Sequence, residues 1–566
     1  MSSSEVRPCH SNDAGDMARH SHPILAVVFF TPFAVSVHAT AAPIALQPGD
    51  DRASSNSAAL QAALDRAAPG DTINLPAGTF PISNSISLKS RITLAGAGTV
   101  STTLIACFKR DQPMILGTGL TSVDLHDFTL YGGGNANVTQ GIQLEKSTTL
   151  NLHDLAIVGL PGSDDPNAPL GPHAVDCTSD VTHSLFTAIT ARSIGIGRTW
   201  GSGIRLSWNS ASNQITHCTI DQTGRGGIFC NDGSTDNVIA NNTVTRSGGV
   251  GLGIEVQNCD RSLIERNKID HWLSVDNSSL SAIRGNIIAA SDKTYKLCGI
   301  EIVDSHDVIV SDNAVNGGAK VGLSLSGPHS KTRMLFNNNL FANGNTWGAQ
   351  IQGDGGGATE LYFQHNAFIA TQQGPDPLYP NQGHGLRING NAHNLTFERN
   401  EINHNTGSGL QITGDGVDDL CFYKNLISDN LGGSVDSDPI KHLAWLGNQV
   451  FPVPPHWLQT AQQMPEPRIA VNIVNATPAA PGADRVLSTT GVPLHFTLRS
   501  EAPYMPHDVL WDFGFGLPRT GPGADQTFAK PDSYAIAVVT WDSGGDAALV
   551  NATIDVRKPN APVRTP

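Results

Sequence analysis

Short segments that alternate apolar and polar residues, each opened by a small residue, recur along most of the chain. In Gly253-Ile-Glu-Val-Gln the apolar residues stand at every second position, which is typical of a strand with one face in a core. Regular members begin at Gly141, Gly203, Gly227, Gly253, Gly299, Gly322, Gly348, Gly385 and Gly409, and less regular ones at Ala174, Trp272 and Gly432. Most neighbours lie roughly 20–30 residues apart, the length of one solenoid coil. The pattern predicts stacked coils.

Asparagine residues recur in phase with these segments, each directly before a short apolar strand. They are Asn242, Asn267, Asn286, Asn313, Asn339, Asn366, Asn400, Asn425 and Asn448. Asn tolerates the left-handed backbone region and bonds readily to neighbouring backbone groups. We therefore expect the asparagines to stack at one corner of the coils as an internal amide ladder.

An amphipathic helix is predicted before the first coil, over residues 56–68, with Leu60 and Leu64 on one face. Such a helix caps a solenoid, whose first coil otherwise exposes apolar residues and strand edges. Gly70-Asp-Thr-Ile-Asn-Leu-Pro-Ala-Gly-Thr-Phe and Ile92-Thr-Leu-Ala-Gly-Ala-Gly follow it. With these motifs, residues 45–450 resemble the pectate-lyase-like right-handed β-helix superfamily. The resemblance implies an all-β, right-handed parallel β-helix, which we place at residues 45–455.

The repeat stops after Val453-Pro-Pro, and residues 469–558 carry a different pattern. Trp511-Asp-Phe-Gly and the strand from Tyr534 to Trp541 resemble a PKD-type β-sandwich, although Gly514-Phe-Gly-Leu-Pro replaces the usual Gly-Asp-Gly. Modules of this type on secreted enzymes are spacers or carbohydrate-contacting appendages. We expect a small β-sandwich domain without chemistry of its own.

Residues 1–41 are predicted to be a leader. A short basic region after Met17, the apolar stretch Pro23–Val37 and Ala39-Thr-Ala match a secretory signal peptide. The apolar stretch is short and interrupted by proline, so it does not predict a membrane span. We expect a secreted, extracellular or periplasmic protein with no membrane span.

Composition narrows the range of partners and cofactors. The 566 residues include 35 Lys and Arg against 50 Asp and Glu, a net charge of −15, which argues against a nucleic-acid partner. Of the eight cysteines, Cys9 would be lost with the leader, and the other seven stand singly and are expected in the core, with at most one disulfide. No zinc motif, phosphate loop or dinucleotide fingerprint stands in a supporting context. We expect neither a metal centre nor a cofactor, with calcium left open.

Alternation along each strand sends two columns of polar side chains out of the coils. Glu255, Asp276 and Glu301 fall on three consecutive coils. Strand spacing predicts Cα distances of about 8 Å for Glu255–Asp276 and about 9.6 Å for Glu255–Glu301. Inverting glycosidases hold their carboxyl pair about 6.5–9.5 Å apart. We expect Glu301 to be the general acid, with Glu255 and Asp276 as candidates for base or nucleophile.

A sugar needs polar partners and aromatic platforms beside the carboxylates, and the same face offers both. Asp176 is a second acidic candidate. It shares its segment with His173 and lies one coil from Arg205. The predicted substrate-binding residues are Arg205, Asp176, Phe229, Asn231, Gln257, Gln350, Arg387, Trp272 and His271.

The expected function is therefore a secreted glycoside hydrolase acting on a polysaccharide or oligosaccharide, with two alternatives. A polysaccharide lyase or uronate epimerase needs an Arg, Lys or calcium beside the base, and neither Arg205 nor Arg387 flanks the acidic trio. The Asp-Pro-His-Asp motif typical of mannuronan epimerases is also missing, since Gly327-Pro-His-Ser is only a distant counterpart. A non-catalytic carbohydrate-binding or adhesive protein is the other alternative. Oligomeric state is open.

Overall fold

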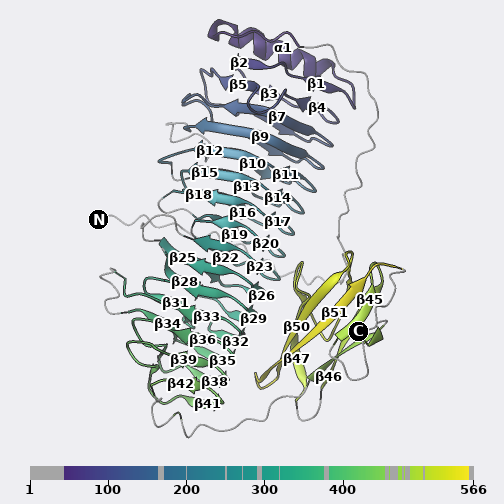
Figure 1. Cartoon of the computed structure of the whole chain (residues 1–566). Helices are drawn as coiled ribbons and strands as arrows, with labels where there is room; N and C mark the ends of the chain where they lie inside the picture. The colour runs from purple at the N-terminus through teal and green to yellow at the C-terminus, as the bar shows by residue number, and fades with distance from the viewer. Residues whose placement is uncertain are drawn as a thin grey trace, which may run out of the picture. The chain divides into compact units, whose positions relative to one another are not determined.

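The structure is a computed structural model of the chain (Figure 1). It describes residues 44–162, 171–198, 200–248, 252–270, 272–289, 296–317, 319–374, 382–452, 458, 469–474, 477–478, 485–500 and 504–559. The predicted signal peptide lies outside the described residues. Among the residues described, no helix has the length and apolar character needed to cross a membrane.

The coils form a right-handed parallel β-helix, as the repeat predicts. Each coil adds one strand to a 14-stranded sheet, here called sheet B, in which neighbouring strands are parallel. The strands of sheet B are β3 (Ile86–Ser87), β6 (Ile115–Thr118), β8 (Ile142–Glu145), β10 (His173–Ser179), β13 (Ser202–Leu206), β16 (Gly226–Asn231), β19 (Ile254–Gln257), β22 (Leu273–Asp276), β25 (Lys296–Val303), β28 (Ala319–Ser326), β31 (Trp347–Gln352), β34 (His384–Asn389), β37 (Leu410–Thr413) and β40 (Val435–Ser437).

Most coils add two further short strands to a second parallel sheet, sheet A, which has 28 strands among the described residues. They are β1 (Thr72–Asn74), β2 (Gly78–Ile82), β4 (Thr93–Ala95), β5 (Thr102–Ala106), β7 (Asp124–Tyr131), β9 (Asn151–Leu160), β11 (Leu185–Thr187), β12 (Thr190–Ile194), β14 (Gln214–Thr216), β15 (Thr219–Thr223), β17 (Val238–Ala240), β18 (Thr243–Thr245), β20 (Leu263–Glu265), β21 (Lys268–Ile269), β23 (Ala282–Arg284), β24 (Ile287–Ala289), β26 (His306–Ser311), β27 (Ala314–Asn316), β29 (Lys331–Asn337), β30 (Leu340–Ala342), β32 (Ala358–Gln364), β33 (Ala367–Ile369), β35 (Ala392–Glu398), β36 (Glu401–Asn403), β38 (Asp418–Tyr423), β39 (Leu426–Ser428), β41 (Lys441–Leu446) and β42 (Gln449–Val450).

The recurrent glycines stand where consecutive coils approach one another closely, before or within the first half of a sheet B strand. A Cβ atom on Gly322 would lie 2.4 Å from the carbonyl oxygen of Gly348, and one on Gly348 would lie 2.5 Å from that of Gly385. No side chain fits at such distances, so glycine is a packing requirement at these positions.

The predicted asparagine ladder is confirmed at all nine positions. Asn339 is representative: its Nδ2 donates to Asn366 Oδ1 at 2.9 Å and to the carbonyl of Val310 at 2.8 Å. The same contacts repeat from Asn242 to Asn448. Because every amide has partners in the coils on either side, the ladder can be buried without unsatisfied polar groups.

The capping helix is present as α1 (Ala53–Arg66), preceded by the short 3-10 helix η1 (Asp50–Arg52). In Figure 1, α1 closes the end of the stack of coils. Leu60 and Leu64 are fully buried against the first coils, as their spacing predicts. Asn56 Nδ2 donates to the carbonyl of Pro81 at 3.0 Å, so the helix satisfies backbone groups of the first coil as well as covering its apolar end.

The described cysteines are all free thiols. Cys177, Cys218, Cys230, Cys259 and Cys298 are buried, and burial raises the pKa of each thiol. They behave as small apolar residues, which agrees with the expected core role, and the disulfide that the sequence allowed is not formed among them.

The C-terminal residues form two β-sheets around their own apolar core, which includes Phe496, Trp511 and Phe513. One sheet contains β43 (Ile469–Val474), β46 (Pro493–Ser500) and β49 (Gly523–Thr527). The other contains β44 (Thr477–Pro478), β45 (Arg485–Thr489), β51 (Ala547–Arg557), β50 (Asp532–Asp542), β47 (Pro506–Asp512) and β48 (Arg519–Thr520). The resemblance to a PKD-type module stays a prediction.

This C-terminal module packs against outward-facing side chains of sheet A. Ile309, Leu335 and Tyr362 point out of three consecutive coils and form one apolar cluster with module residues that include Leu510 and Trp541. Beside them Arg284 Nη1 lies 2.8 Å from Asp512 Oδ1, with both side chains less than a tenth exposed. A buried pair of this kind is costly to break, because either partner alone is an uncompensated buried charge.

Candidate functional site

The first outward column of sheet B follows the predicted register over most of its length. Backbone pairing places these side chains on successive strands: Gln143, Asp176, Arg205, Phe229, Glu255, Ser274, Glu301, Ser324, Gln350, Arg387 and Gln411. In the less regular segment Gly432-Gly-Ser-Val-Asp, the alternation counted from Gly432 predicts Ser434 as the last member of this column, and that prediction is wrong. Gln411 pairs instead with Asp436 and donates to its Oδ2 at 3.1 Å, because Gly432 and Gly433 precede the strand and Ser434 takes the place of the recurrent glycine.

The acidic trio occupies three consecutive strands of sheet B, β19, β22 and β25. Glu255 and Glu301 lie in one column, separated by Ser274, and Asp276 lies in the next column beside Gln257. Strand spacing therefore separates the Cα atoms of the two glutamates by about 9.6 Å. The carboxyl groups act on one another: the charges of Asp276 and Glu301 both raise the pKa of Glu255.

Glu301 is held by hydrogen bonds from the neighbouring coil. Trp272 Nε1 and Ser274 Oγ each donate to Glu301 Oε2 at 3.0 Å. Burial is the main cause that raises the pKa of Glu301, while these two donors oppose the rise. The other oxygen, Oε1, is contacted by Cys298 Sγ at 3.9 Å, so the proton of a general acid would lie on Oε1, beside this thiol.

Glu255 has a cationic neighbour that the sequence did not reveal. Arg225 Nη2 lies 3.5 Å from Glu255 Oε2, and its guanidinium carbon lies 4.3 Å from the ring centroid of Trp200. Burial raises the pKa of Glu255, and Arg225 opposes this. Arg225 stands in the turn before β16, outside the alternating pattern, so no periodic signal connects it with a carboxylate 30 residues later.

Asp276 is positioned by an amide in its own column. Gln257 Nε2 donates to Asp276 Oδ2 at 2.9 Å, and Asn231 pairs in register with Gln257 on the preceding strand. Two of the predicted substrate-binding amides thus lie beside the trio.

Asp176 and His173 form a second, more deeply buried group on β10. Burial raises the pKa of Asp176 to about 7, and the charge of Arg205 on the next strand opposes this. Burial lowers the pKa of His173 to about 3, so the imidazole is neutral, and its Nδ1 bonds to Ser202 Oγ. Asp176 therefore has a carboxyl that exchanges its proton near neutral pH, three strands from Glu255.

The remaining predicted binding residues are more dispersed. Gln350 and Arg387 lie two and three strands beyond Glu301, about 10 and 14 Å along the column. Phe229 lies next to Glu255 in the column but is buried, with its ring 5.3 Å from the Arg225 guanidinium carbon. Phe229 is therefore a packing partner of Arg225 rather than an open platform. His271 lies outside the described residues.

Two groups of side chains that could hold a metal ion lie on sheet A, away from the trio. One contains Asp124, His126 and His153, and the other contains Asp418, Asp419 and His442. Hydrogen bonding to Asp124 is the main cause that raises the pKa of His153 to about 9. Neither group was predicted from the sequence, because each combines residues from two coils without a zinc motif, although the repeated Leu-His-Asp around His126 and His153 was a signal for the first.

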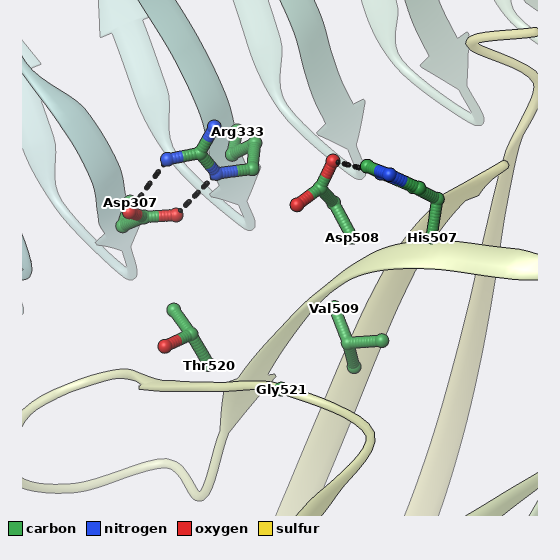
Figure 2. A pocket seen from close by; sticks show the side chains of 7 residues that line it. All are labelled: Asp307, Arg333, His507, Asp508, Val509, Thr520 and Gly521. Carbon is green, nitrogen blue, oxygen red and sulfur yellow. Dashed lines mark hydrogen bonds and ion pairs between the residues drawn. The ribbon is translucent and has the colours of Figure 1, made fainter. Parts of the chain in front are cut away.

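A pocket of about 320 Å³ lies where the C-terminal module meets sheet A (Figure 2). Its lining includes Asp307 and Arg333 from the β-helix and His507 and Asp508 from the module. Arg333 is paired with Asp307 at 2.8 Å, and His507 with Asp508 at 2.8 Å. Because these charges are already paired, we assign the pocket no chemistry.

Two sequence families match parts of the chain. Residues 116–373 match the family described as periplasmic copper-binding protein (NosD), and residues 49–116 match the family described as rhamnogalacturonase A/epimerase, pectate lyase-like. No curated protein sequence matches the chain. The second match, together with the parallel β-helix, confirms the expected resemblance to pectate-lyase-like proteins.

Several solved structures share the fold at low similarity. The mannuronan C-5 epimerase AlgE6 A-module of Azotobacter vinelandii is 16% identical, over 71% of this chain and 96% of that one, with a TM-score of 0.36. The family 28 exopolygalacturonase of Yersinia enterocolitica is 13% identical, over 70% and 75%, with a TM-score of 0.31. The pre-mature gene product 12 of bacteriophage phi29 is 14% identical, over 67% and 55%, with a TM-score of 0.44. At these values none of them assigns a function to this chain.

Proposed function

We propose that this chain is a carbohydrate-active enzyme that hydrolyses glycosidic bonds in a polysaccharide or oligosaccharide. The observation that carries the proposal is the acidic trio on consecutive strands of sheet B, in which burial raises the pKa of both Glu255 and Glu301. The description of the family that matches residues 49–116 names a rhamnogalacturonase and an epimerase, which supports a carbohydrate substrate without choosing the reaction.

Glu301 is the proposed general acid. Its raised pKa favours the protonated carboxyl, which gives its proton to the leaving glycosidic oxygen as the bond to the anomeric carbon breaks. Trp272 and Ser274 hold the other oxygen, so the proton donor is oriented before substrate arrives. Proton donation of this kind contributes about 10²–10⁴-fold to a rate.

Glu255 or Asp276 is the proposed base that removes a proton from the attacking water. The Cα spacing of about 8–9.6 Å leaves room for that water, which favours inversion over a covalent intermediate. Arg225 and Gln257 hold the two carboxylates in place. The exposed ring of Trp208, beside Arg205, supplies a stacking surface farther along the face.

A polysaccharide lyase or uronate epimerase is the second candidate, favoured by Arg225. Abstraction of the proton next to a uronate carboxylate requires a cation to neutralise that group and a base to take the proton. Arg225 provides a cation directly beside Glu255, which neither Arg205 nor Arg387 does. A calcium ion held by the trio would be an alternative cation, since carboxylate oxygens are its preferred ligands.

The test is incubation of the purified protein with a panel of neutral and acidic polysaccharides, with and without EDTA. New reducing ends without ultraviolet-absorbing unsaturated products would support hydrolysis. Unsaturated products would move the protein to the lyases, and a change in uronate configuration without cleavage would move it to the epimerases. Glu301→Gln and Glu255→Gln should lower the activity by about 10²–10⁴-fold, whereas Glu360→Gln, on sheet A, should leave it unchanged. Binding without any reaction would favour the non-catalytic alternative.

Export is part of the proposal. The predicted signal peptide at residues 1–41 and the match to a family described as periplasmic both support a periplasmic or extracellular location. A polymeric substrate is encountered in those compartments. Detection of the processed protein outside the cytoplasm, with the leader removed, tests this.

A further inference from the structure

Two histidine–aspartate pairs are stacked in consecutive coils of sheet A, at the N-terminal end of the β-helix. His126 on β7 pairs in register with His153 on β9, and their rings are stacked with centroids 4.7 Å apart. Asp124 lies two residues before His126 on the same strand and so faces outward with it. One ligand atom of each of these three half-buried residues lies within 4.8 Å of the other two.

The aspartate after each histidine orients its ring. His126 Nδ1 bonds to Asp127 Oδ2 at 2.7 Å, and His153 Nδ1 bonds to Asp154 Oδ2 at 2.8 Å. Both aspartates have positive φ angles, 62° and 49°, which turn each carboxylate back towards the preceding ring. A carboxylate on Nδ1 fixes the ring and leaves Nε2 as the ligand atom, an arrangement that recurs around histidine ligands of metals.

The third ligand is already directed at this position. Asp124 Oδ1 lies 3.2 Å from His153 Nε2, and Asn151 Nδ2 donates to the same oxygen at 3.1 Å. On metal binding, the contact between Asp124 and His153 would be replaced by a bond from each side chain to the ion, for which the His153 imidazole must be deprotonated. Nitrogen ligands of a tetrahedral ion lie about 3.3 Å apart for metal–nitrogen bonds of about 2.0–2.1 Å. Binding therefore requires the Nε2 atoms of the two rings to move closer to one another.

Two other described histidines of the β-helix, His306 and His442, lack part of this arrangement. His306 Nδ1 also bonds to the following aspartate, Asp307, at 2.7 Å, but that carboxylate is paired with Arg333. A guanidinium next to the imidazole disfavours a cation. In the Asp418, Asp419 and His442 group the imidazole is 74% exposed and has no second histidine beside it. His306 and His442 therefore serve as control positions.

We propose that Asp124, His126 and His153 bind one divalent transition-metal ion of the zinc or copper type. Two imidazoles and one carboxylate suit these ions better than calcium or magnesium, which prefer oxygen ligands. The site lies on sheet A and the acidic trio on sheet B, four or more coils farther along the chain, so the ion is independent of the proposed reaction. It clamps two consecutive coils near the capped end of the solenoid.

The test uses the full chain without an affinity tag, stripped with EDTA and dialysed. Titration calorimetry with Zn²⁺ and, separately, with Cu²⁺ should show one site that competes with a chelator, and Cu²⁺ should give an electron paramagnetic resonance spectrum with nitrogen coupling. His126→Ala and His153→Ala should each weaken this site by on the order of 100-fold or more, and Asp127→Asn by about 10-fold. The near-isosteric His126→Gln should weaken it as well while keeping the wild-type circular dichroism spectrum.

The control variants His306→Ala and His442→Ala should bind Zn²⁺ and Cu²⁺ as the wild type does. The proposal is overturned if the wild type binds neither ion, if the site survives in the His126→Ala/His153→Ala double variant, or if His442→Ala removes it. Retention of Zn²⁺ alone or of Cu²⁺ alone supports the site and identifies the ion. None of these outcomes depends on whether the chain cleaves a polysaccharide.

Discussion

The outer faces of sheets A and B are built from the same coils, yet they have opposite characters. Around β22 and β25, sheet B presents carboxylates that are coupled to one another. Over the same stretch of the helix, sheet A presents Ile309, Leu335 and Tyr362, which are covered by the C-terminal module. Farther towards the N-terminus, sheet A again carries polar groups, including His126 and His153.

The difference shows that an outward position in a β-helix does not by itself indicate a binding surface. Ile309 and Glu301 both point away from the coil interior. Ile309 completes an apolar cluster with the C-terminal module, whereas Glu301 lies on a polar face, where burial raises its pKa. What lies opposite each column decides its role. Variants on the two faces should therefore differ in their effects on activity and on stability.

The largest expected effect is on sheet B. Glu301→Gln should lower the rate of glycosidic cleavage by about 10²–10⁴-fold, because an amide cannot donate the required proton. The thermal unfolding temperature should stay close to that of the wild type, since the hydrogen bonds from Trp272 and Ser274 can be kept by the amide oxygen. Initial rates on the best substrate of the panel measure this. A wild-type rate in Glu301→Gln would remove this residue from the mechanism.

The next effect belongs to the contact between sheet A and the C-terminal module. Arg284→Met leaves Asp512 buried without its partner and should destabilise the docked module by about 3–5 kcal/mol. Limited proteolysis between the β-helix and the module, together with calorimetric unfolding, measures this. Arg261→Met is the matched control, because the Arg261–Asp236 pair is exposed and should contribute about 0–1 kcal/mol. Equal effects of the two variants would contradict a buried, coupled pair.

A pH-dependent effect is expected from Asp176 on sheet B. Its folded pKa of about 7 lies above the unfolded value, so its protonated form is the one that the fold favours. The stability that this group contributes is complete below about pH 4 and is lost as the pH rises through about 7. The loss is at most about 4 kcal/mol, for a pKa of about 7 in the folded protein against an ordinary aspartate pKa of about 3.9 in the unfolded chain.

Asp176→Asn removes this titration while keeping the shape of the side chain. The variant should gain stability relative to the wild type as the pH rises from about 4 to about 8, because only the wild type must bury a charge. Unfolding temperatures measured as a function of pH for both proteins test this. A difference that does not change with pH would show that Asp176 keeps its ordinary pKa, and a change of the opposite sign would show that Arg205 stabilises the carboxylate.

The smallest effect is expected inside the coils, at the corner between the two sheet A strands of each coil. Asn339→Ala leaves the carbonyl of Val310 and the amide of Asn313 without their partners and should cost about 1–3 kcal/mol. Asn316→Ala, at an exposed position at the end of β27 that accepts one surface hydrogen bond from Asn343, should cost less than about 0.5 kcal/mol. Chemical denaturation of the two variants measures the difference. Equal losses would mean that the ladder contributes no more than surface asparagines do.

The sequence determined the coil, its register and its cap. Gly322 and Asn339 each mark a contact between one coil and the next, and such contacts repeat with every coil, so they leave a period in the sequence. The same periodicity predicted that Glu255 and Glu301 lie in one column, and the strand pairing confirms it. It failed at Ser434, where two glycines precede the strand and shift the alternation.

Only the tertiary structure decided which groups meet outside this period. Arg225 reaches Glu255 from a turn, and Asp512 reaches Arg284 from the C-terminal module. These ion pairs do not repeat from coil to coil, so they leave no pattern that can be counted along the chain. The Leu-His-Asp segments around His126 and His153 do repeat, but only their stacking in register shows that Asp124 joins the two rings. The scaffold of this protein was thus predictable from its sequence because stacking is periodic, whereas its ion pairs depend on single contacts between residues far apart in the chain.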